Sequence, residues 1–264
     1  MNNSKLIAAL ASYGMSGQVF HAPFLEKHPG FQLKFILERS KNLSKERYPD
    51  AVIVRHFDDI INNKDVDLVV INTPDDLHFQ MAQDALKAGK HVVVEKPFTR
   101  SLSEAQELVD LAEKNNLILA VYQNRRWDSD FLTVQKVIEN GWLGKLVEFE
   151  SHFDRYRLAL KDDWKDQGKA GTGSIYNLGA HLIDQALVLF GKPQALWADI
   201  RRSRPGAAID DDYEVKMIYP DVRVTLKSSY LVREKGPRFI LHGTKGSVVK
   251  YGLDVQEDLL KRGE

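Results

Sequence analysis

The stretch that decides the fold is His91-Val92-Val93-Val94-Glu95-Lys96-Pro97-Phe98. Three consecutive valines favour a β-strand, Gly89 ends the element before it, and Pro97 cannot donate to a strand ladder. A buried strand therefore ends near Lys96. Because ligands bind at the carboxyl ends of strands in open α/β sheets, we expect Lys96 at a ligand-binding edge, where a partly desolvated lysine is suited to proton transfer.

Strand and helix patterns alternate around this stretch. The expected strands are 5–11, 33–37, 52–54, 66–71, 92–96 and 117–121, and the expected helices are 16–27, 58–63, 74–88 and 101–115. Thr73-Pro74 is expected to begin the helix that Gly89 ends, with Pro74 at its first position. Strands that alternate with helices indicate a doubly wound parallel sheet, which we expect over residues 1–123.

The alternation stops after about residue 123. The expected strands are then 147–153, 195–201, 213–219, 222–229, 238–242 and 247–250, and the expected helices are 131–140, 178–190 and 256–264. Strands that follow one another in hairpin order indicate an open, mostly antiparallel sheet faced by helices. The sequence therefore predicts an α/β protein whose second domain, residues 124–264, has an α+β arrangement.

Composition excludes several classes of protein. Lys and Arg together number 37, as do Asp and Glu, so no basic excess points to nucleic acid or an anionic membrane surface. The absence of Cys excludes disulfides, thiolate nucleophiles and Cys-based zinc sites, and it is compatible with a cytoplasmic protein. The apolar run at residues 6–11 is short for a secretory signal, and no segment approaches a membrane span of about 18 apolar residues.

A Gly-rich turn follows the first expected strand. Its sequence is Ser12-Tyr13-Gly14-Met15-Ser16-Gly17, in the place where a dinucleotide-binding fingerprint would lie, and we expect Ser12, Gly14, Met15 and Gly17 to contact a cofactor. Ser12 stands where the fingerprint has its first Gly. Ser12 either distorts the turn or donates a hydroxyl hydrogen bond to a phosphate, and an ordinary strand–helix turn is a third interpretation.

The second expected strand ends in Glu38-Arg39-Ser40, followed by Lys41. An acid here usually accepts the ribose hydroxyls of NAD, whereas Arg and Ser favour the 2′-phosphate of NADP. The three residues after Glu38 favour a cationic pocket, so we predict NADP as the cofactor, with NAD as the alternative. A solvated charged turn is the interpretation without a ligand.

Together these residues resemble the Gfo/Idh/MocA family, named after glucose–fructose oxidoreductase, inositol dehydrogenase and a rhizopine catabolism protein. The matching motifs are Ile71-Asn72-Thr73-Pro74, His78, Ala88-Gly89-Lys90-His91-Val92, Glu95-Lys96-Pro97, Asn124-Arg125-Arg126-Trp127-Asp128, Phe149-Glu150-Ser151 and His181-Leu182-Ile183-Asp184-Gln185. The stretches from Gly14 to Pro23 and from Lys250 to Asp254 look like the branch that contains NADP-dependent scyllo-inositol dehydrogenases.

The resemblance implies a Rossmann domain followed by a domain whose open sheet binds substrate on one face and builds a homo-oligomer, a dimer or tetramer, through the other. It implies hydride transfer between nicotinamide and a sugar, inositol or related polyol, with Lys96 and His181 as catalytic residues. Thr73, Pro74, His78, Glu95 and Lys96 are then expected to line the cofactor site. The family pattern also continues beyond Glu264, so we expect that the sequence is either truncated or lacks the last elements of its second domain.

One departure from the family concerns Asn177, which stands where the family has an Asp four residues before its catalytic His. An amide can hydrogen-bond but cannot carry a proton, which favours an alternative function, a nucleotide-bound sensor or corepressor that has lost the chemistry. A reductase of a non-sugar carbonyl or imine is a further alternative that the same fold permits.

Further side chains are candidates for binding substrate, with an ion-paired loop as the alternative; they are Asn124, Arg125, Arg126, Trp127, Asp128, Arg155 and Tyr156. His21 is expected either to contact the cofactor or to pack its helix. Asp210-Asp211-Asp212 imitates a metal loop, but it precedes a strand with no nearby His, so we expect a solvated turn and no metal site.

Overall fold

The computed structural model describes residues 5–160 and 172–263, and the chain divides into two compact units. The first unit contains Met1–Tyr122 with Glu257–Glu264, and the second contains Gln123–Gln256. The last eight residues group with the first unit, although they follow the second unit in the chain.

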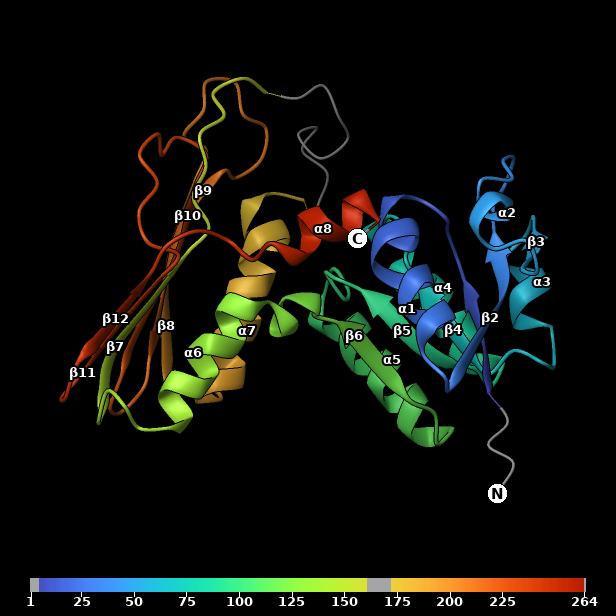
Figure 1. Ribbon diagram of the computed structural model, residues 1–264, viewed down its shortest axis with the longest axis horizontal. Helices are drawn as coiled ribbons and strands as arrows, with labels where there is room; N and C mark the ends of the chain where they lie inside the picture. The colour runs from blue at the N-terminus through green and yellow to red at the C-terminus, as the bar shows by residue number, and fades with distance from the viewer. Residues whose placement is uncertain (1–4, 161–171, 264) are drawn as a thin grey trace. The chain divides into compact units, whose positions relative to one another are not determined.

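The first unit is built on a six-stranded parallel sheet (Figure 1). Its strands are β1 (Leu6–Leu10), β2 (Phe31–Leu37), β3 (Val52–Val54), β4 (Leu68–Ile71), β5 (His91–Glu95) and β6 (Leu119–Tyr122), in the order β3-β2-β1-β4-β5-β6. The order reverses direction between β1 and β4. This is the topological switch point at which Rossmann sheets bind dinucleotides.

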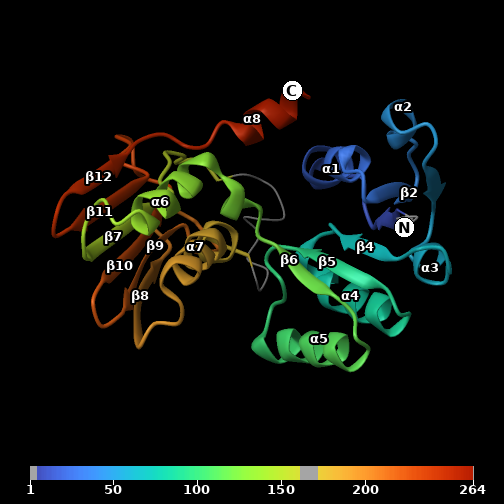
Figure 2. The ribbon, with the colours of Figure 1, turned by 60° about the horizontal axis from the view of Figure 1, so that its bottom comes forward.

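Helices cover both faces of this sheet, which is why its central strands are apolar throughout. They are the π-helical turn η1 (Gly17–His21), α1 (Ala22–Lys27), α2 (Ser44–Arg47), α3 (Asp58–Ile61), the 3₁₀ turn η2 (Asp75–Leu77), α4 (His78–Lys87) and α5 (Leu102–Lys114). In Figure 2, α4 and α5 lie on the face opposite to α1. Ala9 of β1 packs on the α4 and α5 side, whereas Ala8 and Leu10 pack on the α1 side.

The prediction for Thr73-Pro74 is wrong in detail. Pro74 has φ −56° and ψ 145°, an extended conformation, and helical structure begins only at Asp75. The hydroxyl of Thr73 is buried and has no hydrogen-bond partner within the described part of the chain, so it does not cap the helix. The sequence nevertheless located the other end correctly, because Gly89 follows α4 with φ +76°, a conformation that favours glycine.

The second unit contains a six-stranded mixed sheet. Its strands are β7 (Leu146–His152), β8 (Ala195–Arg201), β9 (Asp212–Ile218), β10 (Arg223–Ser229), β11 (Phe239–Gly243) and β12 (Ser247–Lys250), in the order β12-β11-β7-β10-β9-β8. Four of the neighbouring pairs are antiparallel, as predicted for a mostly antiparallel sheet, and β7 pairs in parallel with β10.

Two long helices cover one face of this sheet, α6 (Ser129–Glu139) and α7 (Ala180–Phe190), as Figure 1 shows. The turns η3 (Asn124–Trp127) and η4 (Ile175–Gly179) lead directly into them, and α8 (Gln256–Arg262) ends the described chain. Phe131 of α6, Leu182 of α7 and Phe149 of β7 form the fully buried centre of this core. No helix among the described residues is long and apolar enough to span a membrane.

Candidate functional site

The Gly-rich turn lies at the switch point of the first sheet, directly after β1. The hydroxyl oxygen of Ser12 accepts a hydrogen bond from the Gly14 backbone N–H at 3.2 Å, so Ser12 organises the turn. Its hydroxyl hydrogen stays available for a further acceptor. Gly14 and Met15 are exposed, as residues that contact a ligand need to be.

Gly17 makes the turn compact. The Asn72 side-chain amide, which follows β4, donates to the Ser12 carbonyl oxygen at 2.8 Å and so joins the ends of β1 and β4. A Cβ at Gly17 would lie 2.6 Å from the Ser12 carbonyl oxygen and 2.7 Å from Asn72 Nδ2, so only glycine fits without a backbone shift. The exposed turn, this close backbone packing and the switch point together fit the pyrophosphate of a dinucleotide.

The loop after β2 is organised from inside by Glu38. Its Oε1 accepts hydrogen bonds from the Ser44 hydroxyl at 2.5 Å and the Ser44 backbone N–H at 2.9 Å, and its Oε2 accepts from Leu43 N–H at 2.9 Å. Burial raises the pKa of Glu38, but these hydrogen bonds and the charge of Arg55 together leave the pKa lowered. Glu38 is 6% exposed, whereas Arg39, Ser40 and Lys41 are exposed beside it.

Lys96 follows the last residue of β5, at the carboxyl edge of the sheet, as predicted. The carboxylate of Glu95, the residue before Lys96, accepts three hydrogen bonds. The donors are Ser16 Oγ at 2.6 Å, His21 Nε2 at 2.8 Å and the Lys96 backbone N–H at 3.2 Å. Glu95 therefore joins the Gly-rich turn to the end of β5. His21, which is 4% exposed, is thereby held against the end of β5.

His78, predicted to line the cofactor site, is 1% exposed. Its Nδ1 lies 2.8 Å from the Pro97 carbonyl oxygen and its Nε2 lies 3.0 Å from the Thr73 carbonyl oxygen. Both ring nitrogens are thereby engaged by the backbone. His78 connects the turn after β4 with the turn after β5, and Lys96 lies on the second of these turns.

In the second unit, the motif that contains Asn124 forms the turn η3, and its charged side chains are paired. Arg125 Nη1 lies 3.0 Å from Asp128 Oδ2, and Arg126 donates two hydrogen bonds to Asp184, of 2.8 and 2.7 Å. Burial raises the pKa of Asp128 to about 6, although Arg125 opposes the shift. Arg125, Arg126 and Asp128 therefore all take part in ion pairs.

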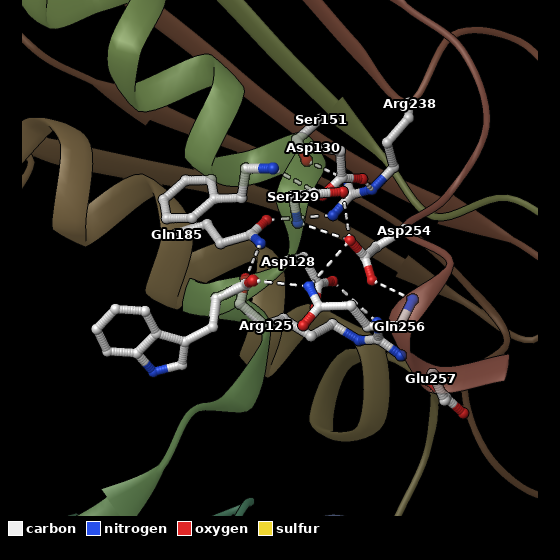
Figure 3. Close-up of polar contacts among 12 residues, drawn as sticks. Arg125, Asp128, Ser129, Asp130, Ser151, Gln185, Arg238, Asp254, Gln256 and Glu257 are labelled. Carbon is white, nitrogen blue, oxygen red and sulfur yellow. Dashed lines mark hydrogen bonds and ion pairs between the residues drawn. The ribbon is translucent and has the colours of Figure 1, made fainter. Parts of the chain in front are cut away.

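A buried polar network supports this turn (Figure 3). Arg238 donates to Ser151 Oγ at 2.5 Å and to Gln185 Oε1 at 3.1 Å, and Gln185 Nε2 in turn donates to the Arg125 carbonyl oxygen at 2.9 Å. Arg238 Nε also lies 3.8 Å from Asp130 Oδ2, an ion pair in which both side chains are at most 3% exposed. Gln185 of α7 thus holds the backbone of η3 directly, and Arg238, which is paired with Asp130 of α6, holds Gln185.

The predicted catalytic residues of the second unit lie at the start of α7. His181 occupies the first turn of α7 and is 5% exposed, and Asn177 lies four residues earlier in η4. The Tyr156 hydroxyl accepts a hydrogen bond from Arg233 at 2.6 Å, and the Arg233 guanidinium lies over the Tyr156 ring, 4.4 Å from its centroid.

The expectation of a solvated turn at Asp210-Asp211-Asp212 is wrong for Asp211. Asp211 is 1% exposed and forms an ion pair with Arg204 at 2.7 Å, and the Asp210 carboxylate accepts the Ile175 backbone N–H at 2.8 Å. The partner Arg204 comes from the loop after β8, a contact that local sequence does not reveal. Within residues 5–160 and 172–263, no cluster of His, Asp or Glu side chains is placed to hold a metal.

His152 at the end of β7 provides a pH-dependent contribution to stability. Burial lowers its pKa, but the carboxylates of Asp154 at 3.4 Å and Glu150 at 2.9 Å outweigh this, so its pKa is raised. The protonated His152 ring therefore stabilises the folded state. This contribution is fully present when the pH is below the pKa of an unfolded histidine, about 6.5, and it is lost as the pH rises through the folded-state pKa.

We therefore expect the free energy of unfolding of the wild type to exceed that of His152→Gln at pH 5.5. The difference should shrink steadily as the pH rises toward 9. Urea unfolding of both proteins across this range tests the prediction, with His56→Gln as an exposed histidine control. A constant difference between wild type and His152→Gln at every pH would contradict it.

Four residues that support the site were given no role by the sequence, namely Asp184, Gln185, Arg238 and Asp254. Asp184 and Gln185 stand within the recognised motif beside His181, and this adjacency is a usable signal. Arg238 precedes an apolar strand, and Asp254 accepts hydrogen bonds from the Ser129 backbone N–H at 2.6 Å and the Ser129 hydroxyl at 2.5 Å. Neither contact leaves a local pattern, because each joins residues more than 50 positions apart.

Comparison with known sequences decides the family. The profile described as an oxidoreductase family with an NAD-binding Rossmann fold matches residues 8–123, and the Gfo/Idh/MocA C-terminal domain profile matches residues 131–249. The chain belongs to the Gfo/Idh/MocA oxidoreductase family. The sequence-based assignment of this Gfo/Idh/MocA protein, including its doubly wound fold, is thereby confirmed.

Individual relatives of this Gfo/Idh/MocA protein agree along nearly the whole chain. The uncharacterised oxidoreductase YdgJ of Escherichia coli is 45% identical over 255 residues, covering 97% of this chain and 74% of YdgJ. The scyllo-inositol 2-dehydrogenase (NADP⁺) IolW of Bacillus subtilis is 37% identical over 254 residues, covering 96% and 71%. A solved structure from Bacteroides fragilis superposes with a TM-score of 0.91 at 52% identity, covering 99% of this chain and 75% of that chain.

Proposed function

We propose that this protein is an NADP-dependent oxidoreductase that interconverts a secondary alcohol and a carbonyl on a sugar, inositol or related polyol. The observation that carries the proposal is the place of Lys96, which directly follows β5 at the sheet edge that also carries the compact Gly-rich turn. The similarity to IolW, a relative named for such a reaction, supports the substrate class.

The residues have separate tasks in this reaction. The turn at Ser12, Gly14, Met15 and Gly17 would hold the pyrophosphate, and the cofactor supplies the hydride acceptor or donor when bound. In oxidation, Lys96 would bind the substrate hydroxyl and take its proton, and His181 is the proposed second acid–base residue. Arg125, Arg126, Asn124, Asp128 and Tyr156 are the proposed contacts for the remaining hydroxyl groups of the substrate.

A panel of inositols, sugars and sugar acids tests the proposal. Each would be incubated with NADP or NAD while the absorbance of the reduced nicotinamide is followed. We expect turnover with at least one cyclic polyol or sugar, and a faster reaction with NADP. Cofactor binding without turnover on the whole panel, in either direction, would contradict the proposed activity.

The preference for NADP rests on the loop after β2. Because the Glu38 carboxylate accepts three hydrogen bonds from Leu43 and Ser44, it is committed to the loop, and the exposed Arg39 and Ser40 are the groups available to a 2′-phosphate. Arg55 supports the loop that carries Arg39 and Ser40, because its guanidinium donates to the Lys41 carbonyl oxygen at 2.7 Å.

Arg39→Ala is therefore expected to weaken NADP binding by roughly 1–3 kcal/mol, the value of a charge-assisted contact, and to leave NAD binding nearly unchanged. Calorimetric titration with both cofactors measures the effect. Lys45→Ala, an exposed cation on α2, is the matched control. Equal titration curves for NADP and NAD that the Arg39 substitution does not alter would refute the preference.

A nucleotide-bound sensor or corepressor is the second candidate function, and Ser12 and Asn177 are the residues that favour it. An Asp at this position, one turn before His181, would orient the imidazole and stabilise its protonated form. If the protein is an active dehydrogenase, we expect Asn177→Asp to raise kcat by roughly threefold to tenfold at saturating cofactor, with little change in cofactor affinity.

Steady-state assays of both proteins, with Asn140→Asp as a surface control, distinguish the outcomes. A loss of activity would indicate that the neutral amide is adapted to the enzyme's own substrate. If neither form turns over while both bind nucleotide, the sensor is the better description.

A further inference from the structure

The carboxylate of Glu95 is the best-anchored ionisable group near the proposed catalytic lysine. Its Oε1 accepts from Ser16 Oγ at 2.6 Å and from His21 Nε2 at 2.8 Å, while Oε2 accepts from the Lys96 backbone N–H at 3.2 Å. Ser16 belongs to the Gly-rich turn, and His21 is the last residue of η1. The third belongs to the lysine itself.

The donors are themselves held in place. His21 is 4% exposed, and its ring lies against the ring of Tyr122 with the centroids 4.3 Å apart. The Tyr122 hydroxyl donates to the Phe20 carbonyl oxygen at 2.8 Å, so the end of β6 is bonded to η1 beside His21. The Glu95 side chain is 14% exposed. Because its partner His21 is held by Tyr122 of β6, contacts from η1 and β6 together fix the Glu95 carboxylate at the end of β5.

Charge is the second property of this group. Burial raises the pKa of Glu95, but the hydrogen bond and charge of His21, the hydrogen bond of Ser16 and the charge of Lys96 together leave it lowered, so the carboxylate is ionised at neutral pH. Attraction between two charges is mutual. An anion fixed beside Lys96 therefore favours the ammonium form of that lysine.

Resting on the function proposed above, we propose that Glu95 is a positioning residue that sets both the place and the charge of Lys96, with Ser16 and His21 as its anchors. The backbone hydrogen bond holds the lysine at the end of β5. The anchors connect that position to the turn proposed to hold the cofactor pyrophosphate.

The test separates charge from geometry with two substitutions. Glu95→Gln keeps the size of the side chain but removes its charge, and Glu95→Asp keeps the charge but shortens the side chain by one methylene. Glu113→Gln, an exposed acid at the end of α5, is the matched control. The kcat pH profile for alcohol oxidation and the titration of ¹³C-dimethylated Lys96, followed by NMR, are recorded for each protein.

Oxidation requires the neutral amine of Lys96, because the amine takes the proton of the substrate hydroxyl. Loss of the neighbouring Glu95 charge lowers the pKa of Lys96, so the neutral amine forms at lower pH. In Glu95→Gln we expect the acidic limb of the kcat profile and the Lys96 titration both to move to lower pH, by about one unit. In Glu95→Asp we expect both to stay near wild type while kcat falls about tenfold or more, because the lysine is displaced.

A Lys96 titration that is identical in wild type and folded Glu95→Gln would overturn the proposal. If Glu95→Gln does not fold, the aspartate variant decides, and an unchanged kcat there would also overturn it. The NMR titration needs no turnover, so it tests the influence of Glu95 on Lys96 even if the substrate panel finds no activity. A failure of the proposed function is thereby distinguishable from a failure of this inference.

Discussion

Replacement of Lys96 by Ala is expected to lower kcat by about 10²–10⁴-fold while the dissociation constant for NADP stays nearly unchanged. This range is typical for the loss of a positioned proton-transfer group. The lysine is proposed to act on the substrate oxygen, whereas the cofactor is held by the turns after β1 and β2. Steady-state kinetics and fluorescence titration with NADPH measure the two quantities separately.

Two further variants make this result specific. His181→Ala should also lower kcat, but less, because water can partly replace a proton relay. Lys87→Ala, an exposed lysine on α4, should behave like the wild type. Full activity in the Lys96 variant would mean that the lysine at the end of β5 is structural and that the chemistry is carried elsewhere.

The second large effect concerns stability and the buried network around Arg238 (Figure 3). Burial lowers the pKa of Arg238 to about 10, against the opposing charge of Asp130, so the guanidinium remains charged at neutral pH. Arg238→Met would leave Asp130, which is 2% exposed, without its counter-charge, and would also remove the donors to Ser151 and Gln185. Breaking a buried ion pair in this way typically costs about 3–5 kcal/mol.

Urea unfolding of Arg238→Met is therefore expected to show a free energy of unfolding lower by about 3–5 kcal/mol. Arg223→Met, an exposed cation on β10, is the control and should change stability by less than about 0.5 kcal/mol. A double-mutant cycle with Asp130→Asn isolates the pair, because the double variant should lose less than the sum of the two single losses. Strictly additive losses would show that the two side chains do not interact.

The fold and part of the site were predictable from local sequence. The run Val92–Val94, ended by Pro97, positions Lys96 at the end of a buried strand, and the alternation of strands and helices predicts the parallel sheet. Gly14 and Gly17 similarly mark a turn after β1. These predictions succeed because strand propensity, helix ends and tight turns depend on residues only a few positions apart.

Only the tertiary structure decided what the charged side chains do. Glu38 and Arg39 are neighbours in sequence, yet one is buried against Ser44 and the other is exposed. Arg238 and Asp130 are more than 100 residues apart, and their pairing depends on how α6 and β11 pack. Burial and the choice of ionic partners are decided when distant segments of the chain come together, so local sequence does not predict them. Strands and turns depend on neighbouring residues, so the sequence by itself predicts them.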